Sequence, residues 1–134
     1  MATKLIELPG YTGSAEAASV AYWRAQDKFL GKANEHKGVK LIALMTHGPA
    51  YLHSNKKVTE LAGVSGMKVR VPGGVGSDVG AALGAKGIKV PAPKVYETLA
   101  SNAADGVVMP FESRKGFKLT EVAKNVYELS LIHI

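Results

Sequence analysis

The sequence predicts an α/β fold with a mostly parallel sheet, built around a β-α-β-α-β unit. Three short runs have strand character, at residues 67–71, 88–90 and 106–109. Two stretches with helical spacing of apolar residues separate these runs, around residues 79–83 and 95–99. Strands that alternate with helices favour parallel pairing through right-handed crossovers.

The composition is that of an ordinary globular domain, with 46% hydrophobic and 21% charged residues in a chain of 134. The absence of cysteine excludes disulfides, thiolate metal ligands and cysteine nucleophiles. The net charge is +6, but the lysines are scattered and only Lys56 and Lys57 are adjacent, so no nucleic-acid partner is predicted. His47 and His53 have no third ligand nearby, so the sequence predicts neither a metal site nor another cofactor.

Before this unit, the pattern predicts a short strand at residues 4–8 and a helix from Ala15 to about Ala33. Residues 39–45 form a nearly continuous apolar run, which is typical of a buried strand. His47 follows this run, and we interpret His47 and His53 as loop residues. Residues 50–53 alternate only weakly, and residues 117–127 allow either a strand or a helix.

The carboxyl ends of parallel strands are where open sheets bind ligands. This rule places Arg70, the loop at residues 72–77, the loop at residues 91–93 and Met109 near one candidate site, and His47 faces the same rim if its strand shares the sheet. Arg70 has two interpretations. In the first, Arg70 and Lys68 are two charges on the more solvent-exposed face of a strand. In the second, the planar guanidinium of Arg70 binds a carboxylate through two parallel hydrogen bonds.

Residues 74–79 have a glycine-rich pattern between a strand and a helix, as in a dinucleotide-binding turn. Val79 stands where the third glycine belongs, and no acidic residue ends the next strand. A nucleotide-binding α/β module or a nucleotide-dependent enzyme is therefore the alternative function. No nucleophile–base pair is recognisable, which favours binding over catalysis.

Five short segments, in order and with matching spacing, resemble the solute-binding proteins of tripartite ATP-independent periplasmic (TRAP) transporters, the DctP family. They are residues 66–72, 82–85, 95–99, 104–106 and 121–124. The resemblance implies a periplasmic two-lobe α/β protein that closes on a carboxylate-containing organic acid, such as a dicarboxylate. It also implies that the protein passes this solute to a membrane permease and is not an enzyme.

In this resemblance, Arg70 corresponds to the arginine with which the family binds the carboxylate of its ligand. We take the candidate ligand-binding residues to be Arg70, His47, Tyr51, Gly74, Asp78 and Met109. The sialic-acid-binding branch has different residues where Ala50, Ala92 and Met109 stand, so the resemblance implies a different organic acid.

The family's chains are much longer than this one, so we expect an internal fragment of such a protein. Residues 1–65 would belong to the first lobe and the hinge crossover, and residues 66–124 to the second lobe. Residues 125–134 would form a tail that departs from the family, and its native origin is left open.

Overall fold

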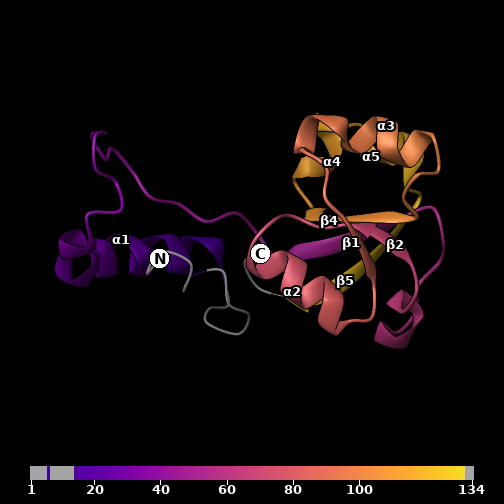
Figure 1. Ribbon diagram of the computed structural model, residues 1–134, viewed down its shortest axis with the longest axis horizontal. Helices are drawn as coiled ribbons and strands as arrows, with labels where there is room; N and C mark the ends of the chain where they lie inside the picture. Colours follow the sequence, from indigo (N-terminus) through magenta and orange to yellow (C-terminus); the bar gives the residue numbers. More distant parts are fainter. Residues whose placement is uncertain (1–5, 7–13, 132–134) are drawn as a thin grey trace.

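The computed structural model describes residue 6 and residues 14–131, which form two parts (Figure 1). One part holds α1 (Ala15–Ala25) and the extended segment that follows it, and the other holds the sheet and the remaining helices. The strand expected at residues 4–8 lies, apart from Ile6, outside the described residues.

The helix expected from Ala15 to Ala33 is present, but its winding changes along its length. Ser14 caps α1, since its hydroxyl oxygen accepts a hydrogen bond of 3.1 Å from the Ala17 amide. The chain continues as the π-helical η2 (Gln26–Leu30) and the 3₁₀ turn η3 (Gly31–Ala33). Asn34 then takes the left-handed conformation that often ends a helix.

The described residues form a five-stranded sheet in the order β3-β2-β4-β1-β5. The strands are β1 (Ala50–Ser54), β2 (Lys68–Arg70), β3 (Lys86–Ile88), β4 (Gly106–Pro110) and β5 (Asn125–Leu131). β2 pairs in parallel with both β3 and β4, which confirms the predicted β-α-β-α-β unit, although its second strand begins two residues earlier than expected, at Lys86. β1 runs antiparallel to both β4 and β5, so every strand of this sheet except β1 points the same way.

Helices cover both faces of the sheet (Figure 1). α3 (Val95–Ala100), α4 (Ser113–Gly116) and α5 (Leu119–Val122) lie over one face, with η5 (Ala92–Lys94) leading into α3. α2 (Val75–Ala82) lies over the other face, and η4 (Leu61–Val64) contributes Val64 to the apolar cluster there. The two faces therefore carry separate apolar clusters, one around Leu52 and Val69 and the other around Val107 and Leu119.

The prediction of a buried strand at residues 39–45 is wrong. This segment is extended but pairs with no other strand among the described residues, and Val39 and Ile42 are 70% and 84% exposed. The weakly alternating residues 50–54 form β1 instead, which lies inside the sheet between β4 and β5. Alternation is weak there because β1 is covered on both faces, so both sets of its side chains are largely buried.

Residues 117–131 contain both a helix and a strand, α5 and β5. The segment expected as a tail from residue 125 begins with β5, which pairs with β1 from Asn125 onward. The boundary expected between residues 65 and 66 falls inside one sheet, because β1 lies between β4 and β5.

Candidate functional site

One edge of the sheet brings together three chain segments that are far apart in sequence. The carboxyl ends of β2 and β4 lie there, and so does the amino end of the antiparallel β1, because Ala50 pairs with Pro110. A cavity of about 280 Å³ opens at this edge. It is lined by His47, Arg70, Pro72, Val108, Met109, Pro110, Glu112 and Ser113.

Arg70 is the buried charge of this cavity. It ends β2 with 9% of its surface exposed, and its Nε donates a hydrogen bond of 3.0 Å to the Val90 carbonyl. Burial lowers the pKa of the Arg70 guanidinium, because it disfavours the charged form. Among the residues that the structure describes, no carboxylate pairs with Arg70. A largely buried cation without a partner favours an anionic ligand.

Glu112 and His47, which belongs to the segment before β1, also line the cavity. Glu112 Oε1 accepts a hydrogen bond of 2.9 Å from the Gly48 amide. Burial raises the pKa of this carboxyl, but the Gly48 amide, the amide of Glu112 itself and the charge of His47 outweigh burial and leave the pKa below its ordinary value. His47 Nδ1 lies 2.8 Å from the Gly48 carbonyl, so this nitrogen donates the hydrogen bond.

The structure brings three of the six expected ligand-binding residues to this cavity: His47, Arg70 and Met109. His47 arrives by a different route from the one expected, since it precedes the amino end of β1 rather than following a strand. Glu112 and Ser113 also line the cavity but were not among the expected residues. Their place directly after β4 was the signal that could have identified them, because the loop at the carboxyl end of a parallel strand faces the ligand edge.

Tyr51, Gly74 and Asp78 do not line this cavity. Tyr51 lies opposite Met109 in the sheet, but its ring packs edge-on against Phe111, with 5.6 Å between the ring centroids. Gly74 and Asp78 belong to the start of α2, which packs on the other side of the sheet from α3 and α5. A position after a strand was therefore not enough to predict that a residue lines the cavity. The chain turns away from the cavity at Gly73 and Gly74.

His53 is a buried strand residue rather than a loop residue, because β1 is the strand flanked on both sides by β4 and β5. Its Nε2 lies 3.1 Å from the Met109 carbonyl and donates to it. Burial lowers the pKa of His53, and the positive charge of Arg114 lowers it further, while the backbone carbonyls raise it. The neutral imidazole therefore supports the backbone of β4 next to the cavity.

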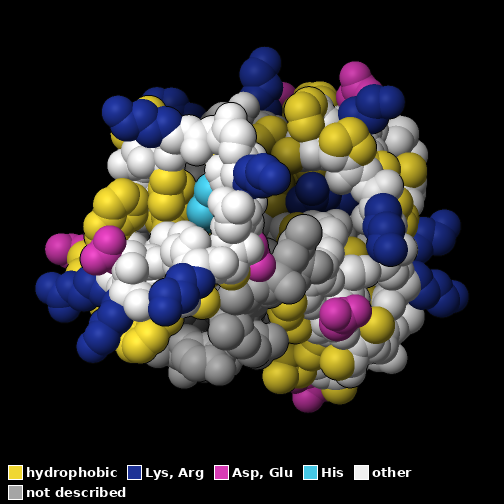
Figure 2. All heavy atoms as spheres, turned by 60° about the vertical axis from the view of Figure 1, so that its left-hand side comes forward, with side chains coloured by type: hydrophobic (Ala, Val, Ile, Leu, Met, Phe, Trp, Pro, Cys, Tyr) yellow, Lys and Arg dark blue, Asp and Glu magenta, His cyan; other side chains and the backbone are white. Residues whose placement is uncertain are grey.

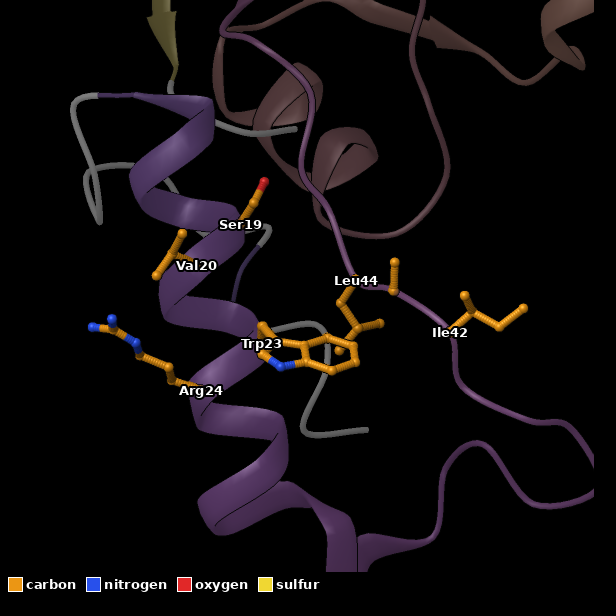
Figure 3. Close-up of a pocket in the computed structure, with 7 residues that line it drawn as sticks. Ser19, Val20, Trp23, Arg24, Ile42 and Leu44 are labelled. Carbon is orange, nitrogen blue, oxygen red and sulfur yellow. The ribbon is translucent and has the colours of Figure 1, made fainter.

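A second hollow lies in the other part of the molecule, between α1 and the extended segment (Figure 3). Its volume is about 350 Å³, and Val20, Trp23, Ile42 and Leu44 line it. Trp23 and Leu44 point toward one another, whereas Arg24 extends away from the hollow (Figure 3). With the guanidinium directed outward, this apolar hollow is a weaker candidate for an anionic ligand than the cavity at Arg70.

Comparison with known proteins identifies the family. The model of the bacterial extracellular solute-binding proteins, family 7, matches residues 3–133 of this chain. The chain belongs to the DctP family. This match includes residues 125–133, which lie beyond the segments that carried the resemblance in the sequence.

Solved structures of DctP-type proteins have the same fold. A TRAP periplasmic solute-binding protein from Bordetella bronchiseptica, with bound (R)- and (S)-mandelate, is 41% identical with a TM-score of 0.84. The match covers 92% of this chain and 40% of that protein. A marine metagenome TRAP solute-binding protein with bound 3-hydroxybenzoate is 34% identical, also with a TM-score of 0.84, over 92% of this chain and 38% of that protein.

A curated relative is the outer membrane transporter protein TsaT of Comamonas testosteroni, which is 28% identical over 128 residues. That match covers 94% of this chain and 38% of TsaT, so this DctP chain spans about two fifths of the length of its relatives. In the part of the chain that the structure describes, no helix has both the length and the apolar character needed to cross a membrane.

Proposed function

We propose that this DctP chain is part of the periplasmic solute-binding subunit of a TRAP transporter and that Arg70 binds the carboxylate of an organic acid. The observation that carries this proposal is the largely buried Arg70 guanidinium, which faces a cavity and pairs with no carboxylate of the described residues. A carboxylate would complete a charge-assisted pair there, and family membership supports the same role. The protein would then deliver the solute to a membrane permease.

The ligand that fits this cavity best is an aromatic monocarboxylate. Pro72, Val108 and Met109 give the cavity an apolar wall beside the buried Arg70 guanidinium. Relatives support this class, since the Bordetella and metagenome proteins hold mandelate and 3-hydroxybenzoate. A wall of this kind packs against a ring, while Arg70 holds the charge.

Binding explains the site better than nucleotide chemistry does. The glycine-rich residues 74–76 lie at the start of α2, outside the cavity that holds Arg70. The family consists of solute-binding proteins, and we propose that this chain binds its ligand without transforming it.

The division of this chain between two lobes is also a proposal. α1 and the extended segment would belong to one lobe and most of the sheet to the other, with residues 46–49 as the crossover between them. Glu112 and His47 meet at this crossover, beside the cavity. Closure of the lobes about such a crossover would remove water from the site and strengthen the pair between Arg70 and the ligand.

The test is titration calorimetry with mandelate on the chain in its complete reading frame. Arg70→Lys keeps the charge but loses the planar fork, so we expect mandelate affinity to fall by about 1.5–3 kcal/mol, roughly ten- to a hundredfold. Arg70→Ala should lose more. Lys68→Ala is the matched control, since it removes an exposed charge from the same strand. Equal affinity of Arg70→Ala and the wild type would contradict the proposal.

A further inference from the structure

We propose that Glu112 selects the ligand, by accepting a hydrogen bond from a hydroxyl group of the acid and by repelling a second carboxylate. This inference rests on the proposed binding of an organic acid at Arg70. It narrows the substrate class to hydroxy-substituted monocarboxylates. The starting point is that Glu112 and Arg70 line the same cavity but form no ion pair with each other.

The Glu112 carboxylate is held in place by the backbone that precedes β1. Oε1 accepts the Gly48 amide, and a Cβ atom built on Gly48 would lie 3.1 Å from Oε2. A side chain at position 48 would therefore press on the Glu112 carboxylate, which would have to shift by a few tenths of an ångström. The crossover segment therefore orients the Glu112 carboxylate, a hydrogen-bond acceptor, at the wall of the cavity through the Gly48 amide.

The chemistry of this wall restricts what can bind. An ionised carboxylate only accepts hydrogen bonds, and the lowered pKa of Glu112 keeps it ionised at neutral pH. Arg70 neutralises one carboxylate of the ligand, so a second carboxylate would face Glu112 with like charge. A hydroxyl group instead donates to Glu112 in a charge-assisted hydrogen bond. The same cavity thus favours a hydroxy acid over both the unsubstituted acid and the dicarboxylate.

The experiment uses two matched sets of probes, because the position of the hydroxyl group on the ligand is open. The first set is phenylacetate, mandelate and phenylmalonate, which differ by a hydrogen, a hydroxyl or a carboxylate on one carbon. The second is benzoate, 3-hydroxybenzoate and isophthalate. Affinities are measured by titration calorimetry on the chain in its complete reading frame, for the wild type, Glu112→Gln and Glu97→Gln. Glu97 lies on α3, outside the cavity, so Glu97→Gln removes the same charge from the chain without touching the site.

In at least one set, the wild type should bind the hydroxylated acid about tenfold more tightly than the unsubstituted acid, and the dicarboxylate should bind more weakly. Glu112→Gln should reduce the hydroxyl preference to about threefold or less and should improve binding of the dicarboxylate by about tenfold. The amide oxygen that this substitution introduces can still accept the Gly48 amide, so the variant should keep the wild-type thermal unfolding midpoint. Glu97→Gln should change none of these ratios.

Two results would overturn the inference while the proposed function stands. One is tight, Arg70-dependent binding with the same hydroxyl and dicarboxylate ratios in Glu112→Gln as in the wild type, in both sets. The other is a wild type that prefers the unsubstituted acid or the dicarboxylate in both sets. If the wild type binds none of these acids, the proposed function fails, and this inference fails with it.

Discussion

Both parts of this molecule contain apolar segments, but these are buried in one part and mostly exposed in the other. In the sheet, Leu52 of β1 and Val107 of β4 are fully buried between helices and neighbouring strands. In the other part, Val39, Ile42 and Met45 of the extended segment are mostly exposed. Figure 2 shows apolar side chains gathered in patches on the surface, between dispersed lysines and arginines.

The contacts between α1 and the extended segment are few and partly polar. The Thr46 amide donates a hydrogen bond of 2.9 Å to the Ser19 hydroxyl, and the Thr46 hydroxyl donates one of 3.1 Å to the Ala15 carbonyl. Trp23 and Leu44 supply apolar contact (Figure 3). An apolar run of this chain is therefore buried only where partner strands and helices are present to cover it.

The largest expected effect is the loss of stability caused by a core substitution in the sheet, compared with a similar substitution in the extended segment. Leu52→Ala should lower the free energy of unfolding by about 2–5 kcal/mol, because it leaves a cavity in a fully packed cluster. Ile42→Ala should change it by less than about 0.5 kcal/mol, because this side chain is 84% exposed. Urea unfolding followed by circular dichroism measures both. Similar losses for both variants would show that Ile42 is covered in solution and would remove the contrast.

A smaller effect is expected from replacing a glycine by alanine, because the cost depends on how tightly each part is packed around that glycine. A Cβ atom on Gly80 of α2 would lie 2.7 Å from Val71 Cγ1, and a β-branched side chain cannot easily rotate away. Gly80→Ala should therefore cost about 1–2 kcal/mol, although alanine is the better helix former. Gly31→Ala, in η3, meets only the Gln26 carbonyl at 3.6 Å and should leave stability unchanged or slightly higher. A stabilising Gly80→Ala would indicate that α2 sits less closely on the sheet.

The smallest effect is a pH dependence confined to the sheet. Because the pKa of buried His53 lies below its ordinary value near 6.5, the unfolded chain takes up this proton first as the pH falls. The His53 contribution to stability is therefore present above about pH 6.5 and is lost as the pH falls toward the lowered pKa. The slope from this group is at most about 1.4 kcal/mol per pH unit.

His53→Leu removes this titration and should flatten the dependence of the free energy of unfolding on pH between about pH 7.5 and 5. Tyr51→Leu, on the same strand, is the control and should keep the wild-type slope. Urea unfolding at several pH values measures the slopes. An unchanged slope in His53→Leu would assign the acid sensitivity to other groups.

The sequence by itself determined the β-α-β-α-β unit and the place of Arg70 in it. Periodic apolar runs and glycine or proline breaks are local signals, and a right-handed crossover between parallel strands leaves few alternatives. Local patterns also located Met109 and the helix beginning at Ala15. The segments that carry the family resemblance come mostly from this same unit.

Only the tertiary structure decided which apolar segments become strands and which residues reach the cavity. Residues 39–45 are more apolar than residues 50–54, yet the latter form β1, because a strand requires neighbours that pair with its backbone. The same antiparallel placement of β1 brings His47 to the cavity that Arg70 lines, and the turn after β4 adds Glu112. The cavity thus joins residues about 20 to 65 positions apart, and no local pattern of the sequence encodes this arrangement.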